Sequence, residues 1–174
     1  MLKKYLVAYK SRHALKKNPV VRINPSFQEA KHIGILFTWE GEKKVEIIQH
    51  FVDELKISGK KCSVLCFYHK KEEIPSKTFK FFTPNDFDPL GSAKTDTLKQ
   101  LINSKFDFLF HLDTLKNIYI EYILAHSQAK CRVSRLDFER KDFYDFMIKT
   151  GDNEGIEHLC RHVLHYTKSL VNHE

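Results

Sequence analysis

The sequence contains little cysteine, glycine or proline and no long apolar stretch. Its 174 residues include four Cys, six Gly and five Pro, which excludes disulfide-rich scaffolds, collagen-like chains and low-complexity polymers. No run of about 18 apolar residues is present, so a transmembrane helix is not expected. Residues 1–17 interleave charged with apolar side chains, unlike the apolar region of a signal peptide, and this predicts a cytoplasmic protein.

Apolar residues are nevertheless abundant. They make up 42% of the chain and include 14 Phe, which supplies bulk for a core without cross-links. A chain of this length buries roughly 70% of the surface that it exposes when unfolded. We therefore expect one globular domain.

The positive charge is concentrated at one end of the sequence. The chain carries 29 Lys and Arg against 22 Asp and Glu, a formal charge of +7. The first acidic residue is Glu29, and seven cations precede it: Lys3, Lys4, Lys10, Arg12, Lys16, Lys17 and Arg22. The rest of the chain is electrically balanced. This predicts a basic arm at residues 1–24 that can be removed without touching the core of a single domain at residues 25–174.

The arm has the periodicity of a short amphipathic helix. One face gathers Leu2, Leu6, Tyr9 and His13, with Tyr5 beside them. The alternatives for this face are docking on the body of the protein or simple solvation, an anionic partner such as RNA or the ribosome, and an anionic membrane. The membrane is the least favoured partner, because a narrow stripe with two Tyr buries little apolar area.

Short apolar runs alternate with helical periodicity along the rest of the chain. The runs predict strands at residues 32–38, 61–68, 79–82, 106–112, 130–133 and 143–148. Apolar residues spaced by three and four predict helices at residues 43–56, 92–103, 115–127 and 153–171. Strands that alternate with helices form a mostly parallel sheet covered on both faces. We therefore predict an α/β fold, a three-layer Rossmann-like or flavodoxin-like sandwich preceded by a basic N-terminal helix.

A ligand site in such a sheet lies beyond the carboxyl ends of the strands, where the strand order reverses. If the strands at 32–38 and 106–112 are neighbours, this edge gathers four candidate catalytic residues, Glu40, Glu42, His111 and Asp113. A carboxylate there would act as a general base, and His111 would polarise a group or move a proton. Candidate ligand-binding residues at the same edge are Thr38, Trp39, Gly41 and Thr114.

A structural role is the favoured interpretation of the same residues. Asp113 or Thr114 would cap the next helix, and His111 would be a hydrogen-bonded core histidine. The turn after the first strand has neither a G-x-G-x-x-G nor a Walker A pattern, so NAD, FAD, ATP or another cofactor is not expected. No metal site is expected either: the last helix carries His158, His162 and His165 on its solvent face, and the cysteines have the character of buried hydrophobes.

Two resemblances extend this interpretation. The run FDFLFHLDTLKNIYIEYILAHSQAKCRVS at residues 106–134 resembles part of the acceptor-side domain of heptosyltransferase-like glycosyltransferases. The order of IGILF, FFTPNDFDPLGSAK, FDFLFHLD and FYDFMI resembles a family of short bacterial proteins of unknown function. The second resemblance implies a Rossmann-like fold and no activity. It adds loop and strand-end candidates: Asn85, Asp86, Phe87, Gly91, Lys94, Tyr144 and Asp145.

Three functions are compatible with these features. The leading hypothesis is a binding or interaction module whose cationic arm contacts an anionic partner, RNA or ribosome before membrane. The alternative is a small enzyme, or a degenerate glycosyltransferase-like domain, that binds a sugar or polar ligand at the strand-order reversal, with Asn85 and Asp86 as further ligand-binding candidates. A third hypothesis is a homo-oligomer that associates through aromatic side chains such as Phe87 or Tyr144.

Overall fold

The computed structural model describes residues 2–69, 78–151 and 154–170. The helices are α1 (Leu2–Lys17), α2 (Glu42–Ile57), α3 (Asp96–Asn103), α4 (Ile118–His126) and α5 (Ile156–Lys168). The strands are β1 (His32–Thr38), β2 (Lys61–Phe67), β3 (Lys80–Phe82), β4 (Phe108–His111), β5 (Cys131–Arg135) and β6 (Phe146–Ile148). Two 3₁₀ helices follow β3 and β5, η1 (Pro84–Asp86) and η2 (Phe138–Phe143).

The strands form one parallel sheet in the order β3-β2-β1-β4-β5-β6. This is the order of a Rossmann fold, in which the direction of strand addition reverses between β1 and β4. Ile35 of β1 lies between Val64 of β2 and Phe110 of β4, and all of β1 after His32 is buried. The apolar runs therefore marked buried central strands, and the predicted α/β sandwich is confirmed.

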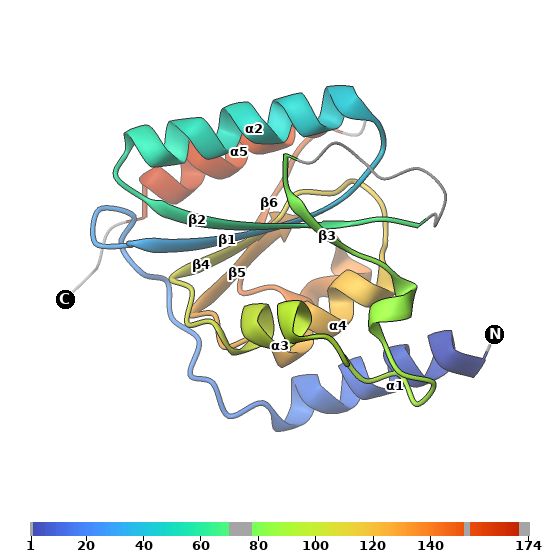
Figure 1. Ribbon diagram of the computed structural model, residues 1–174. Coiled ribbons are helices and arrows are strands. Elements are labelled where there is room, and N and C mark those ends of the chain that lie inside the picture. Colours follow the sequence, from blue (N-terminus) through green and yellow to red (C-terminus); the bar gives the residue numbers. More distant parts are fainter. Residues whose placement is uncertain (1, 70–77, 152–153, 171–174) are drawn as a thin grey trace.

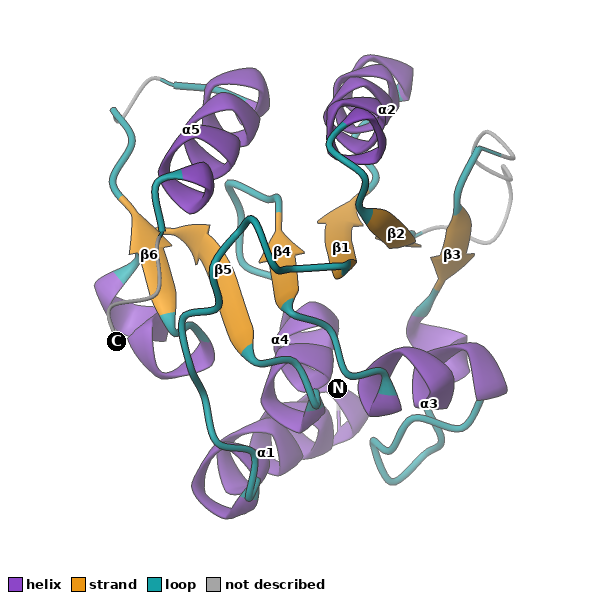
Figure 2. Ribbon diagram, turned by 90° about the vertical axis from the view of Figure 1, so that its left-hand side faces the viewer, coloured by secondary structure: helices purple, strands orange, loops and turns teal. Residues whose placement is uncertain are grey.

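Helices cover both faces of the sheet (Figure 1). The helices α2 and α5 lie on one face, and α3 and α4 lie on the other (Figure 2). The helix α1 adds an outer layer on this second face, where it packs across α4. No helix in the described ranges is both long enough and apolar enough to cross a membrane.

The helix α4 is buried on every side. All residues from Tyr119 to Ala125 are buried, including Glu121. Because a helix that is apolar all round must be covered all round, the sheet alone cannot bury α4. The second cover is α1, which presents Val7, Ser11 and Ala14 to the body. Val7 is fully buried, so the prediction of an arm that can be removed without touching the core is wrong.

The face of α1 that packs is opposite to the predicted apolar stripe. Leu2, Tyr5 and Tyr9 are 73%, 69% and 66% exposed. The packed face instead uses Val7 with the small residues Ser11 and Ala14, which let two helices approach closely. The two tyrosines of α1 therefore remain exposed to solvent.

The chain after α1 is tied to the last turn of α4. The Asn18 side-chain amide donates to the carbonyls of Ala125 and Ser127 at 3.0 and 3.1 Å. The Arg22 guanidinium donates to the carbonyls of Ser127, at 3.0 Å, and Ala129. Burial lowers the pKa of Arg22 to about 10. Arg22, one of the predicted polyanion-binding residues, thus satisfies carbonyl groups at the carboxyl end of a helix.

Gly91 allows the loop between β3 and α3 to lie directly against α1. Its φ is +78°, and a Cβ added there would be 2.7 Å from the Val7 backbone nitrogen. From α1, Lys3 donates to the Pro84 carbonyl and Lys10 to the Ser92 hydroxyl of the same loop. Helix and loop are therefore one packed unit.

Replacing Gly91 with Ala tests this packing, with Gly59 as a matched control. Gly59 has a φ of +77°, but a Cβ there would meet no atom of the described residues within 4 Å. Gly59→Ala should lower the free energy of unfolding by about 1 kcal/mol, the cost of a left-handed L-residue. Gly91→Ala should cost at least about 1 kcal/mol more, because the new methyl group overpacks the α1 backbone. Urea unfolding measures both, and equal losses would contradict the packing.

Candidate functional site

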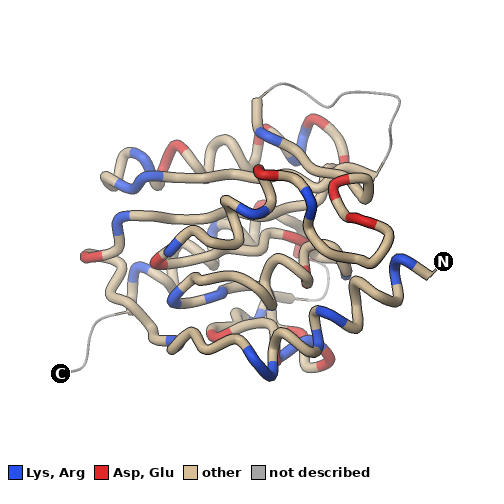
Figure 3. Tube along the Cα trace, turned by 60° about the horizontal axis from the view of Figure 1, so that its bottom comes forward, with Lys and Arg blue, Asp and Glu red and all other residues tan. Residues whose placement is uncertain are grey.

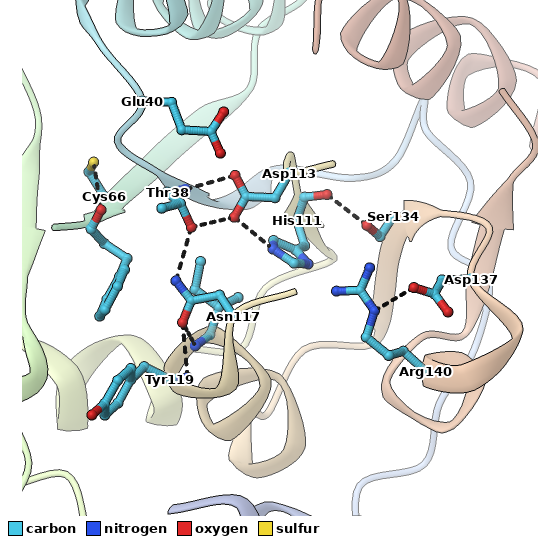
Figure 4. Close-up of polar contacts among 12 residues, drawn as sticks. Thr38, Glu40, Cys66, His111, Asp113, Asn117, Tyr119, Ser134, Asp137 and Arg140 are labelled. Carbon is cyan, nitrogen blue, oxygen red and sulfur yellow. Dashed lines mark hydrogen bonds and ion pairs between the residues drawn. The ribbon is translucent and has the colours of Figure 1, made fainter. Parts of the chain in front are cut away.

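Asp113 lies just beyond β4, at the point where the strand order reverses, and it is buried. Its carboxylate accepts hydrogen bonds from the Thr38 backbone N–H at 2.8 Å and from the Thr38 hydroxyl at 2.7 Å. The Asn117 amide in turn donates to the Thr38 hydroxyl oxygen at 3.0 Å. Figure 4 shows these side chains converging from the ends of β1 and β4. The carboxylate thus joins the two central strands at their carboxyl ends.

The negative charge of Asp113 is balanced by a buried cation, Lys44. The Lys44 ammonium, on the first turn of α2, lies 2.6 Å from Asp113 Oδ1 and 3.2 Å from Glu40 Oε2. Lys44 is only 5% exposed, whereas Glu40 is exposed. A buried charge is tolerated when it is paired and hydrogen-bonded, and both members of this pair meet that condition.

His111 connects Asp113 to Tyr144. Its Nε2 lies 3.0 Å from Asp113 Oδ2, and its Nδ1 lies 2.7 Å from the Tyr144 hydroxyl. Because a carboxylate only accepts hydrogen bonds, Nε2 donates to Asp113. Burial raises the pKa of Tyr144, so the phenol keeps its proton, and its hydroxyl lies within hydrogen-bonding distance of the His111 ring. We refer to the set Thr38, Lys44, His111, Asp113 and Asn117 as the Asp113 cluster.

The environment of Asp113 holds it ionised. Burial alone would raise its pKa, but hydrogen bonding and charge from His111 and Lys44 outweigh burial and lower the pKa to about 2. A carboxylate with such a pKa is a poor general base near neutral pH. The chemistry of the cluster therefore favours a structural role for Asp113.

The other residues predicted at this edge are only partly brought into the cluster. Trp39 is half-buried and packs edge-on against Tyr68, with ring centroids 5.2 Å apart. Gly41 has a φ of +114° and precedes α2, and Glu42 is the exposed first residue of that helix. Thr114 is partly exposed, and Asn117 rather than Thr114 or Asp113 caps α4 by accepting from the Tyr119 and Ile120 N–H groups.

The two ligand-binding candidates in the long loop lie elsewhere. Asn85 and Asp86 form η1 after β3, two strands away from β1. The Asp86 carboxylate accepts from the Thr83 N–H at 2.7 Å and the Thr83 hydroxyl at 2.9 Å. Asp86 therefore closes a local capping box and does not contribute to the Asp113 cluster.

Several candidates from the family resemblance are buried or form contacts within the protein. Phe87 and Tyr144 are 1% and 6% exposed, so the predicted self-association through these two side chains is wrong. Asp145 forms an ion pair with Arg132, whose Nε lies 2.9 Å from Asp145 Oδ2. Lys94 is exposed, and only its backbone N–H, which donates to Asp86, is bonded within the loop.

Three cavities in the described part of the chain lie away from the Asp113 cluster. One of about 570 Å³ lies between α2 and α5, and one of about 490 Å³ lies along β2 between α2 and α3. The third, of about 550 Å³, lies between α1, the start of α4 and η2. None of the three is lined by Thr38, Glu40 or Asp113.

The predicted polyanion-binding residues separate into two groups. Lys3, Lys10 and Arg22 donate to the body of the protein. The cationic side chains that remain exposed on α1 are those of Lys4, Arg12, Lys16 and Lys17. Four of the seven predicted polyanion-binding cations therefore remain exposed on α1.

The metal and thiol candidates form no assembled site in the ranges that the structure describes. No group of three His, Cys, Asp or Glu side chains there is placed to hold a metal ion. His158 and His165 are exposed, and His162 is half-buried. All four cysteines are free, and the prediction of buried thiols is confirmed for Cys66, Cys131 and Cys160.

Sequence reasoning missed two members of the Asp113 cluster, Lys44 and Asn117, and a buried acid that lines the third cavity, Glu121. Lys44 has no distinguishing signal, since it follows two charged residues in a helix and has the pattern of a solvent-facing lysine. Asn117 could have been found, because Asn directly before an apolar helical run is a typical N-cap. Glu121 could also have been found, as the one acid in the apolar run IYIEYILA.

Removing the Asp113 charge should destabilise the fold. In Asp113→Asn, the buried Lys44 keeps the exposed Glu40 as its charged partner but loses the buried carboxylate, so the free energy of unfolding at pH 7 should fall by about 3 to 5 kcal/mol. As a control, Asp53→Asn removes an exposed carboxylate 3.8 Å from Lys56 and should cost less than about 1 kcal/mol. Urea unfolding measures both variants.

The contribution of Asp113 should also depend on pH. Its folded pKa of about 2 lies below its unfolded value of about 3.9, so it stabilises the fold fully above pH 4. About 2 kcal/mol should be lost as the pH falls from 4 toward 2, and the Asp113→Asn variant should lack this loss. If the free energies of unfolding of the wild type and the variant fell equally between pH 4 and pH 2, the result would contradict the pairing.

The comparisons with known proteins identify a family and leave the activity open. No curated protein and no solved structure is significantly similar to this chain. One family model matches residues 3–170, which spans α1 through the end of α5. With nearly its whole length matched, the chain belongs to the Family of unknown function (DUF6913).

Proposed function

We propose that this protein is a Rossmann-like binding module that binds single-stranded RNA on the outer face of α1. The observation that carries the proposal is a stripe of exposed side chains, Tyr5, Tyr9, Arg12 and Lys16, which we call the outer stripe. Their spacing of four, three and four residues places them on one face of the helix. Tyr5 and Tyr9 lie away from the residues of α1 that pack on α4, and Arg12 and Lys16 also reach the cavity between α1, the start of α4 and η2.

The side-chain types of the outer stripe suit a single-stranded nucleic acid. Bases stack on aromatic rings, and Lys and Arg contact the phosphates that connect the bases. Tyr9 is already aligned with His13, with ring centroids 6.3 Å apart and an interplanar angle of 23°. Two roughly parallel rings on one face form a platform of the kind on which unpaired bases stack.

Further cations extend the electrostatic reach of the outer stripe. Lys4 and Lys17 are exposed near the two ends of α1. Figure 3 shows Lys and Arg distributed along this helix at one side of the molecule. No acidic residue lies on α1, so nothing on the helix itself opposes a phosphate chain. A cytoplasmic location, where RNA including ribosomal RNA is abundant, agrees with this proposal.

Two other functions have less support. A membrane partner would use the apolar residues of the exposed face, and Leu2 is its only strongly exposed aliphatic side chain among the described residues. The enzyme or degenerate glycosyltransferase-like alternative would use the Asp113 cluster, whose carboxylate oxygens are already occupied by Thr38, Lys44 and His111. We therefore do not propose catalysis at that point.

A charge-reversal pair tests the proposal. Arg12→Glu/Lys16→Glu should weaken binding of a single-stranded RNA at least about tenfold at 100 mM salt. The slope of log K against log salt should shrink by about 1.4, the value for two lost phosphate contacts on a single strand. Fluorescence anisotropy with a labelled oligonucleotide across a salt series measures both quantities.

The matched control changes the same net charge on the other face of the sheet. Lys43 on α2 and Lys168 on α5 are exposed, so Lys43→Glu/Lys168→Glu should leave the affinity within about twofold. If both charge-reversal pairs weakened RNA binding equally, binding would depend on net charge alone, and the assignment to α1 would be wrong. Unchanged binding by the α1 pair, or binding only to anionic vesicles, would overturn the proposal.

A further inference from the structure

The cavity between α1, α4 and η2 contains two buried polar side chains whose bonding is incomplete. Glu121 and Arg140 are 4% and 8% exposed, and both line this cavity. Within the described residues, Glu121 Oε1 and Arg140 Nη1 have no hydrogen-bond partner. Buried polar atoms without partners are rare, and each calls for a bonding group that the protein alone does not supply.

Arg140 is held so that only part of its guanidinium is satisfied. It lies at a kink in η2, with φ of −117° and ψ of 15°, and its Nε donates to Asp137 Oδ2 at 2.7 Å. Figure 4 shows this pair beside Ser134 and His111, with the Arg140 side chain extending from η2 toward the end of β4. The ion pair fixes the arginine and leaves Nη1 available to donate.

Glu121 is held on the first turn of α4, beside the same cavity. Burial raises the pKa of its carboxyl, and the nearby charges of Lys116, Arg140, His111 and Arg12 oppose this rise. These groups lie on the loop before α4, on η2, on β4 and on α1. A carboxylate in this position accepts hydrogen bonds from hydroxyl or amino groups.

The rest of the lining divides into a charged mouth and an apolar wall. Arg12 and Lys16 are exposed cations on α1, Lys116 is an exposed cation in the loop before α4, and Glu139 and Asp142 lie on η2. The apolar wall is formed by Ala8, Leu15, Ile118 and Phe143. A volume of about 550 Å³ is within the range of small-molecule sites.

We propose that this cavity binds a nucleoside monophosphate unit. The ribose hydroxyls donate to Glu121 and accept from Arg140, the base packs against the apolar wall, and the phosphate contacts Arg12, Lys16 and Lys116. The ribose, the base and the phosphate would thus each contact side chains of matching chemistry. A ligand without a phosphate would form no ion pair with the three cations at the mouth.

The same unit occurs free in solution and at the end of an RNA strand. The proposal does not require the outer stripe to bind RNA, although Arg12 and Lys16 belong to both surfaces. Glu121, Arg140 and Lys116 belong to the cavity alone, and Tyr5 and Tyr9 belong to the outer stripe alone. Variants of these two sets therefore separate failure of one proposal from failure of the other.

Titration calorimetry of the full chain with AMP, GMP, CMP and UMP tests the proposal. At least one ribonucleotide should bind, and its 2′-deoxy form should bind more weakly because it lacks a hydroxyl group for Glu121. Glu121→Gln should weaken binding at least about tenfold, since it removes a charged acceptor. The variant should still fold, because it replaces an incompletely paired buried carboxyl with a neutral group of the same shape.

A matched pair of surface lysines controls for electrostatics. Lys116→Ala should weaken nucleotide binding several-fold, whereas Lys141→Ala, an exposed lysine outside the cavity lining, should not change it. Tyr9→Ala should also leave mononucleotide binding unchanged. Binding that is insensitive to both Glu121→Gln and Lys116→Ala would overturn the assignment to this cavity.

Two RNA strands distinguish the sources of the ligand. If the cavity takes an RNA end, a strand with a free 3′-terminal ribose should bind more tightly than the same strand ending in a dideoxynucleotide, and Glu121→Gln should abolish the difference. If it takes a free nucleotide, the two strands should bind alike while the mononucleotide binds on its own. Failure of all four ribonucleotides and of the ribose-ended preference would overturn the proposal.

Discussion

The burial of α4 by α1 is the contact on which the rest of this structure depends. A helix with seven consecutive buried residues needs cover on the side that faces away from the sheet, and Val7, Ser11 and Ala14 supply it. Once α1 is docked in this way, its packed face is apolar or small, and its tyrosines and four of its cations, Lys4, Arg12, Lys16 and Lys17, remain exposed. One short helix therefore completes the core and also carries the surface that we propose for RNA.

The Asp113 cluster performs a different task at the carboxyl edge of the sheet. In many Rossmann-like proteins this edge is open to a ligand. Here a buried carboxylate ties β1, β4 and the first turn of α2 together, with its oxygens occupied by Thr38, Lys44 and His111. On the α1 side of the sheet, Glu121 and Arg140 line a cavity with buried polar atoms that have no partner among the described residues. Both proposed binding surfaces therefore depend on the position of α1.

The sequence predicted most of the fold because the buried strands are uninterrupted apolar runs and the helices between them are amphipathic. It did not predict which face of α1 docks, since Ser11 and Ala14 pack through their small size, a property that hydrophobicity does not record. The all-round burial of α4 was readable in IYIEYILA, and it implies a second covering layer. The gathering of Thr38, His111 and Asp113 followed from the strand-order rule. The buried Lys44 and the exposed α1 stripe depend on tertiary contacts, so local pattern could not predict them.

The central claim is that α1 binds a partner while it remains docked on α4. The most direct measurement is an NMR titration of the full chain with single-stranded RNA, combined with amide hydrogen exchange. The account predicts shift changes at Tyr5, Tyr9, Arg12, His13 and Lys16, none on α2 or α5, and unchanged exchange of the α4 amides. Faster exchange in α4 on addition of RNA would show that α1 leaves the body to bind, and shift changes confined to other surfaces would contradict the account entirely.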